Sequence, residues 1–453
     1  MLSKKTIRYY YWLALEFIKK HLRIILLSFL LSFIVIISFI SFSPYIETFL
    51  FSKKNIVGIV GEYDFNNLPD EVISKISNGL LFINEKGEFV PALASTWEVS
   101  DKGKEYRFHL RDGLIWSDGK KFRAYDIVYQ FKDITTKVLD DKTIYFKLAK
   151  PLPVFPTYLK KPITKYPLVG VAGLYKVDNM ITKYGNITEV SLSPNKNDTP
   201  ILQYKFFRTE SELINAYKRG EINEMKITKK SLADVFKTWK NSVVTKTVDY
   251  TRLLTLFFNF NNEFLKQKEI RQTLLLAVER SKFEEFGELA LGPIAPNSWA
   301  YNGNLKTPIF DRTAAEKTFK KETGATSSAQ LNFYTYYDYL NYAEQITNDL
   351  KASGLDINLK LLSSERPDNF DLFLAFWNVP ADPDQYFFWH STQTQGNLGS
   401  YKNVKIDKLL EDGRNTNSLA EREKIYLEYQ RVIVDDPPAD FLYFPYVYTI
   451  KRK

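Results

Sequence analysis

Alternation of apolar and polar residues marks β-strands in the body of the chain. Between Glu105 and Leu110, the apolar residues Tyr106, Phe108 and Leu110 alternate with polar ones. A period of two places one set of side chains on the core face of a sheet and the other set in solvent. We therefore predict a strand with one buried face here. A Ser-Asp-Gly turn follows, and we predict a helix over residues 124–131.

Helical periodicity alternates with these strands further along the chain. Residues 268–283 carry apolar side chains on one helical stripe, and a capping box, Ser418 to Glu421, opens a second amphipathic helix. A third helix is predicted to end at Ala352, with Gly354 as its cap and an alternating strand after it. A final aromatic strand is predicted over 441–450. The polar stretches 178–200 and 323–330 are expected to be surface loops, so the body has an α/β pattern.

The segment 24–46, IILLSFLLSFIVIISFISFSPYI, contains no charged residue. As a helix it would extend about 34 Å, which is enough to cross a bilayer core of about 30 Å. Basic residues precede it, so we predict a single-pass cell-membrane protein with a cytoplasmic N-terminus and an extracytoplasmic body. The alternative is a cleaved signal peptide, with small residues at Ser41 and Ser43. The apolar run is longer than a usual signal-peptide core, which favours an uncleaved anchor.

Charge and composition narrow the possible functions. The net charge is +9 over 453 residues, of which residues 1–23 contribute +5 and the rest only +4. The absence of a basic stripe with interleaved aromatics argues against nucleic acid as a partner. Cysteine is absent and only three His are present, far apart in sequence, so we expect no metal site. Aromatic residues make up 15% of the chain, enough to line a ligand cavity.

The sequence lacks the common catalytic motifs. The sequence has no His-Glu-x-x-His, no Gly-x-Ser-x-Gly, no phosphate-binding Gly-rich loop and no dinucleotide fingerprint. We therefore expect a non-enzymatic protein with no catalytic residues and no cofactor.

The segment 374–401, LAFWNVPADPDQYFFWHSTQTQGNLGSY, is the strongest candidate for a binding site. A ligand amine in a closed cleft needs an opposing carboxylate, which Asp382 or Asp384 could supply. Trp377 and Trp389 could supply apolar walls. The alternative is that both Trp are core residues and that the two Asp belong to a turn.

Several separated motifs, in order, resemble the extracellular solute-binding proteins of family 5, the oligopeptide- and dipeptide-binding components of ABC importers. The resemblance runs from about residue 55 to 453. Its most specific part is NGLLFINEKGEFVPALASTWEVSDKGKEYRFHLRDGLIWSDGKKFRAYDIVYQFKD, residues 78–133. LFFNFNN with KEIRQTLLLAVERSKF, and the segment from ADPDQYFFW to EYQRVI, match further parts of the family pattern.

The resemblance implies a two-lobed α/β clamshell, of the type II binding-protein kind with a small extra subdomain, behind one N-terminal transmembrane helix. Expected domains are a cytoplasmic segment 1–23, the membrane helix 24–46, lobe I over 55–255 with its subdomain at about 80–160, lobe II over 256–430, and a return to lobe I over 431–453. Asp382 resembles the family carboxylate that pairs with a peptide amine, with Asp384 as the alternate. Trp377, Trp389, Asn397 and Asn259 are weaker ligand candidates.

The implied function is capture of a peptide, or a similar polar solute, for delivery to ABC permease subunits. The alternative function is a non-transport tethered receptor or chaperone that uses the same clamshell. Two departures from the family pattern stand out: a membrane helix takes the place of a lipidated Cys, and the small subdomain is shortened after Asp133.

Overall fold

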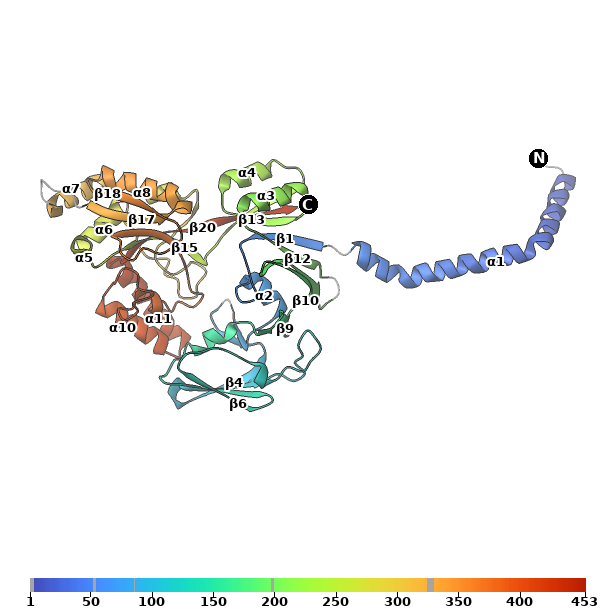
Figure 1. Cartoon of the computed structure of the whole chain (residues 1–453), viewed down its shortest axis with the longest axis horizontal. Coiled ribbons are helices and arrows are strands. Elements are labelled where there is room, and N and C mark those ends of the chain that lie inside the picture. Colours follow the sequence, from blue (N-terminus) through green and yellow to red (C-terminus); the bar gives the residue numbers. More distant parts are fainter. Residues whose placement is uncertain (1–3, 52–53, 85, 197–198, 324–329) are drawn as a thin grey trace.

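One twelve-stranded β-sheet runs through both lobes of the body (Figure 1). The computed structural model describes residues 4–51, 54–84, 86–196, 199–323 and 330–453. Strand order along the sheet is β10-β11-β12-β1-β13-β20-β15-β19-β17-β18, with β14 and β16 also paired to β20. The two-lobed α/β architecture implied by the family resemblance is therefore confirmed.

Lobe I contains the first part of this sheet and three helices. Its strands are β1 (Lys54–Val60), β10 (Tyr175–Lys183), β11 (Asn186–Pro194), β12 (Ile201–Phe207), β13 (Glu224–Ile227) and β14 (Ser242–Val248). Its helices are α2 (Asp70–Ile76), α3 (Glu210–Arg219) and α4 (Lys230–Lys237). Helix α3 begins at Thr209, whose side chain accepts a hydrogen bond from the Glu212 backbone, and ends at Gly220 in the left-handed conformation.

A separate four-stranded sheet forms the small subdomain of lobe I. Its strand order is β4-β5-β7-β6. Tyr106, Phe108 and Leu110 of β5 are buried, which confirms the predicted core face. The strands are β4 (Ala94–Ser100), β5 (Glu105–Leu110), β6 (Ile134–Asp140) and β7 (Thr143–Leu148), with the hairpin of β2 (Leu81–Ile83) and β3 (Phe89–Pro91) and the 3₁₀ helix η3 (Phe155–Lys160) beside them.

Lobe II has a central strand that is buried on both faces. In β15, residues Leu254 and Leu256 pack into one core, while Leu253 and Phe257 pack into the other. Helices cover both sides of the sheet, so β15 is apolar at nearly every position. The other elements are β16 (Gly287–Leu289), β17 (Gln330–Tyr336), β18 (Asp356–Leu362), β19 (Leu372–Asn378), α5 (Glu263–Lys266), α6 (Lys268–Ala277), α7 (Arg312–Thr323), α8 (Leu340–Ala352), α9 (Tyr386–Trp389), α10 (Val404–Asn415) and α11 (Leu419–Asp435).

The chain crosses between the lobes at two adjacent places. Residues 249–251 join β14 of lobe I to β15 (Arg252–Phe258) of lobe II. Strand β20 (Ala439–Arg452) pairs through its first residues with β15 and through its last residues with β14. The Asp249 backbone NH donates to the Pro445 carbonyl at 2.8 Å, so the two crossings are hydrogen-bonded to each other. The expected boundaries at 255 and 430 stay predictions.

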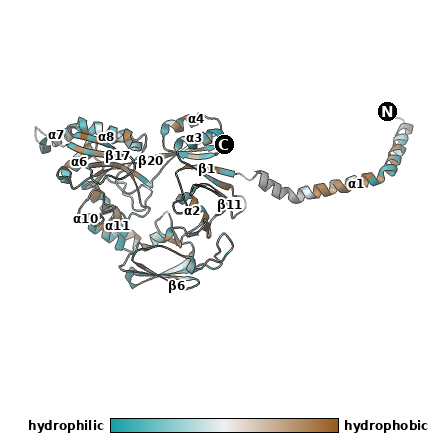
Figure 2. Ribbon diagram, viewed as in Figure 1, coloured by the Kyte–Doolittle hydropathy of each residue, from teal (hydrophilic) through white to brown (hydrophobic). Residues whose placement is uncertain are grey.

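A long helix, α1 (Lys4–Phe51), projects away from the body (Figure 1). Its segment Arg8–Ser38 is long and apolar enough to cross a membrane, and the most apolar part is not buried by the body. Figure 2 shows hydrophobic residues along the middle part of this helix. The predicted span 24–46 lies within α1. A signal sequence near the N-terminus can also meet these criteria of length and hydropathy, so they do not distinguish it from an anchor.

Two local predictions are wrong. In place of a helix over 124–131, a single 3₁₀ turn, Ala124–Asp126, is followed by extended chain. The carboxylate of Asp126 accepts hydrogen bonds from the Trp116 indole and the Arg123 backbone, and these contacts close the turn. The stretch 178–200 contains most of β10 and β11 rather than a loop. Within the other predicted loop, residues 324–329 lie outside the described part of the chain.

Candidate functional site

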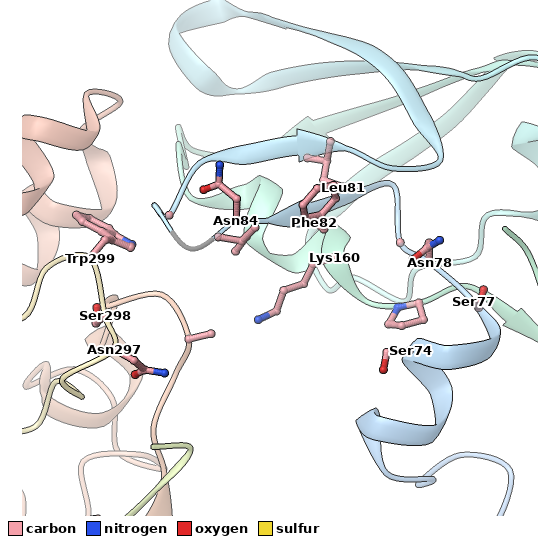
Figure 3. Close-up of a pocket in the computed structure, with 15 residues that line it drawn as sticks. Ser74, Ser77, Asn78, Leu81, Phe82, Asn84, Lys160, Asn297, Ser298 and Trp299 are labelled. Carbon is pink, nitrogen blue, oxygen red and sulfur yellow. The ribbon is translucent and has the colours of Figure 1, made fainter. Parts of the chain in front are cut away.

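A cavity of about 380 Å³ lies where the two lobes face each other (Figure 3). Lobe I lines it with the end of α2, the strand β2 and the chain after η3. Lobe II lines it with two loops. The lining residues are Ser74, Ser77, Asn78, Gly79, Leu81, Phe82, Ile83, Asn84, Gly87, Lys160 and Pro162 from lobe I and Asn297, Ser298, Trp299 and Ala381 from lobe II.

The lobe I wall is held together by close backbone contacts. The Leu80 backbone NH donates to the Leu159 carbonyl at 2.9 Å, and the Ile163 NH donates to the Asn78 carbonyl at 3.0 Å. A Cβ atom at Gly79 would lie 2.4 Å from the Leu159 carbonyl oxygen, so no larger residue fits there without a backbone shift. These contacts fix the point from which the Lys160 side chain leaves the backbone.

Trp299 of lobe II contacts lobe I at Gly87. A Cβ atom at Gly87 would lie 2.3 Å from Cδ1 of this indole, so the hairpin backbone and the indole are in direct contact. On its other side the indole packs edge-to-face on Tyr426, and the Arg422 guanidinium lies 5.2 Å from the indole ring centre. Tyr426 and Arg422 of lobe II therefore support Trp299 at the edge of the cavity.

The carboxylate of Asp382 is engaged in an ion pair. Its two oxygens accept from the Arg422 guanidinium at 2.6 and 3.1 Å, and the Asp384 backbone NH donates to it at 3.0 Å. The side chains of Asp382 and Arg422 are only 12% and 5% exposed. Ala381, one residue before, lines the cavity, but Asp382 does not. Its predicted pairing with a ligand amine stays a prediction.

Asp384 is also held in an ion pair, with Arg414 of lobe II. It accepts from Nε and Nη2 of Arg414 at 3.2 and 2.9 Å. Burial raises the pKa of Asp384 above its ordinary value, and the guanidinium of Arg414 offsets part of that effect. Burial also raises the pKa of Tyr158, a residue of η3 in lobe I, which Asp384 and Arg414 influence as well. This ion pair therefore lies against lobe I.

Both predicted Trp residues lie in the core of lobe II. Trp377 is 8% exposed and donates to the Thr255 hydroxyl at 3.1 Å; Trp389 is 3% exposed and donates to the Gln385 side chain at 3.1 Å. The two indoles pack edge-to-face on each other. The core alternative accounts for their positions, and a ligand role for them stays a prediction.

The two predicted Asn residues have structural partners. Asn397 donates to the Tyr401 carbonyl at 2.7 Å and accepts from the Tyr401 backbone NH at 2.9 Å, so it closes the loop before α10. Asn259 donates to the Phe370 carbonyl at 2.5 Å and accepts from the Asn261 backbone NH. Neither lines the interlobe cavity.

A second, smaller cavity of about 130 Å³ lies beside the first. It shares Asn297, Ser298 and Ala381 with the larger one and continues along the loop after β19. The segment 374–401 therefore contributes to the cavities through backbone and small side chains. Its two carboxylates, Asp382 and Asp384, form ion pairs with arginines of lobe II.

Sequence reasoning did not single out Lys160, Asn297 or Trp299. Lys160 is one of many surface-type lysines, and nothing in its local pattern indicates a cavity. Trp299 lies in a loop that contains two prolines, LGPIAPNSWAY. A Trp beside a proline-containing loop is also the feature that made residues 374–401 a candidate site. That signal could have placed Trp299 among the candidates.

Comparison with known proteins identifies the family to which the chain is similar. The family model described as bacterial extracellular solute-binding proteins, family 5 Middle, matches residues 88–399. The oligopeptide-binding protein AppA of Bacillus subtilis is 24% identical over 86% of each chain. The probable deoxycholate-binding periplasmic protein YgiS of Escherichia coli is 22% identical over 83% of this chain and 84% of its own. The crystal structure of NikZ from Campylobacter jejuni in complex with Ni(L-His) matches 89% of this chain and 94% of its own, with a TM-score of 0.72 and 24% identity.

Proposed function

Because the chain belongs to the bacterial extracellular solute-binding proteins of family 5, we propose that it captures a peptide, or a similar polar solute, between its lobes and delivers it to the permease subunits of an ABC importer. The observation that carries this proposal is the cavity of about 380 Å³ lined by both lobes. A ligand there touches both walls at once and therefore favours the closed arrangement of the lobes.

The connections between the lobes suit such a movement. Within the described part of the chain, the crossings are β20 and residues 249–251, and they are adjacent. Small dihedral changes at neighbouring crossings can rotate one lobe relative to the other while each core stays packed. The remaining interlobe contacts are local, such as Trp299 on Gly87, and can separate and re-form.

The solute class rests on the cavity lining and on the relatives. Hydroxyl and amide side chains line much of the cavity and can hydrogen-bond to a polar solute, while Phe82 and Trp299 provide apolar surface. The relatives' names include an oligopeptide and deoxycholate as ligands. Within the described residues no group of three or more His, Asp or Glu side chains could hold a metal ion directly. A peptide is our first choice.

Helix α1 is proposed to anchor the body at the outer face of the cell membrane, with the N-terminus in the cytoplasm. This proposal is supported by the uncharged segment 24–46 and by the basic residues that precede it, which favour a cytoplasmic N-terminus. Intact-mass measurement of the protein from the membrane fraction should give the full-length chain. A mass that lacks the residues before about 44 would instead identify a cleaved signal peptide.

Closure on a ligand can be measured directly because the chain has no native cysteine. We suggest Cys substitutions of Lys137 on β6 and Lys424 on α11, both exposed, followed by spin labelling. Saturating tri-alanine should shorten the distance between the labels. Native mass spectrometry of the purified protein would identify any solute retained from the cell. An unchanged distance with every retained solute and peptide would contradict the proposed capture.

A further inference from the structure

Among the described residues that line the interlobe cavity, a single one is charged, and it is cationic. Of the 15 lining residues that the structure describes, Lys160 alone carries a formal charge. Figure 3 shows its side chain extending into the space between the lobe I wall and the loop that carries Asn297, Ser298 and Trp299. Among the described residues, no carboxylate lies within salt-bridge distance of its ammonium group.

The acidic residues nearest along the lobe II loop are unable to neutralise this charge. Asp382 is held by Arg422 and Asp384 by Arg414, each through two hydrogen bonds. Moving either carboxylate to the cavity would leave a buried guanidinium without its partner, which is strongly unfavourable. Over the lining residues that the structure describes, the cavity is therefore net positive.

The position of Lys160 is set by the backbone and not by a flexible loop. Lys160 is the last residue of η3, and its backbone packs closely on Gly79. A Cβ atom added at Gly79 would lie only 2.6 Å from the Lys160 carbonyl carbon. Leu159 is fully buried and accepts the Leu80 backbone hydrogen bond. The Lys160 side chain itself is exposed. Closure of the lobes around a ligand therefore removes water from its ammonium group, while the backbone position of Lys160 stays fixed.

We propose that this cavity selects solutes that present a carboxylate to Lys160 and lay an apolar portion along Phe82 and Trp299. This inference rests on the proposed solute-capture function. A carboxylate gains a charge-assisted hydrogen bond and neutralises an ammonium that closure would otherwise leave desolvated. A cationic group at this place meets like charge. The carboxylate can come from the C-terminus of a short peptide or from a non-peptide acid.

The test compares acids with their neutral amides, using the full-length protein in nanodiscs and titration calorimetry. The probes are tri-alanine and tri-alanine amide, and hexanoate and hexanamide. Loss of a hydrogen bond to a charged group corresponds to a decrease in affinity of about tenfold to a hundredfold. We expect at least one acid to bind more tightly than its amide by such a factor. Lys160→Gln should remove that difference, and Lys160→Arg should keep most of it.

Lys161→Gln is the matched control, because Lys161 is exposed and adjacent but does not line the cavity. It should leave the acid-to-amide ratio unchanged. If tri-alanine binds the wild type but each acid binds no more tightly than its amide, the inference is overturned and peptide capture is left intact. Binding of hexanoate through Lys160, with no binding of either peptide, would support the inference and contradict peptide capture. Failure of both acids to bind, or a ratio unaffected by Lys160→Gln, would overturn it.

Discussion

Substitution of Asp382 separates a structural role from a ligand role for this carboxylate. Asp382 and Arg422 form a two-point ion pair at 2.6 and 3.1 Å, and their side chains are 12% and 5% exposed. Asp382→Asn removes the negative charge and leaves the guanidinium buried without a counter-charge. Breaking a buried pair in this way costs about 3–5 kcal/mol.

Part of that cost is offset by the other contacts of Arg422. Its Nε donates to the Gly413 carbonyl at 2.9 Å, and its guanidinium lies against the rings of Trp299 and Tyr426. We therefore expect Asp382→Asn to lower the free energy of unfolding of lobe II by about 3 kcal/mol, near the lower end of that range. Arg422→Met in the same chain should recover part of the loss, because no buried charge then remains unpaired.

The assay is urea unfolding followed by Trp fluorescence, since lobe II contains Trp299, Trp377 and Trp389. A double-mutant cycle with Arg422→Met should give a coupling free energy of about 2–3 kcal/mol. Calorimetry with tri-alanine and N-acetyl-tri-alanine completes the test. An unfolding free energy within about 0.5 kcal/mol of the wild type, together with loss of binding for the free amine only, would refute the structural role and support the predicted ligand role.

Two further predictions concern the interlobe contact and a buried acid. Gly87→Ala should increase the distance between labels on the two lobes, because the added Cβ would meet the Trp299 indole. Gly113→Ala is the control, because Gly113 has a similar φ (+71°, against +79° at Gly87) but open space around the added Cβ. Equal label distances in the two variants would argue against the contact. Asp440 is 1% exposed, its carboxylate receives no hydrogen bond from a described residue, and burial raises its pKa although Arg280 lies 3.7 Å away. Because the folded-state pKa is above the unfolded value of about 3.9, ionisation of Asp440 opposes folding as the pH rises through 3.9. Urea midpoints measured from pH 3 to pH 7 should therefore show Asp440→Asn gaining stability relative to the wild type, whereas a relative loss would show that pairing with Arg280 dominates.

Local patterns that agree with the tertiary environment were predicted well. The apolar stripe of 268–283 is buried, with Ile270, Leu274 and Ala277 all at most 1% exposed. Helix α8 ends at Ala352 as predicted, and Gly354 adopts a φ of +94° before β18. The Ser418 side chain caps α11 by accepting from the Glu421 backbone. In each case the pattern or the cap depends on residues within or next to the same element, so it can be recognised in the sequence.

The wrong local predictions share a cause. The helix predicted over 124–131 is replaced by a short turn because the Trp116 indole, ten residues before Asp126, hydrogen-bonds to its carboxylate. Strands β10 and β11 were predicted as loop because many of their residues are exposed and polar. Their backbone groups pair with each other, and β11 pairs with β12, so hydrogen bonding to a neighbour outweighs composition.

The sequence by itself determined the family, the α/β pattern and the apolar N-terminal helix, because these depend on periodicity, composition and motifs that are read along the chain. It also indicated that the loop around Asp382 lies near the site. Only the tertiary structure decided which side chains face the cavity. Asp382 and Asp384 turn into lobe II because Arg422 and Arg414, 40 and 30 residues later, neutralise them there. Lys160 faces the cavity without such a partner among the described residues. The order of charged residues along the chain does not determine which of them form ion pairs in the folded protein.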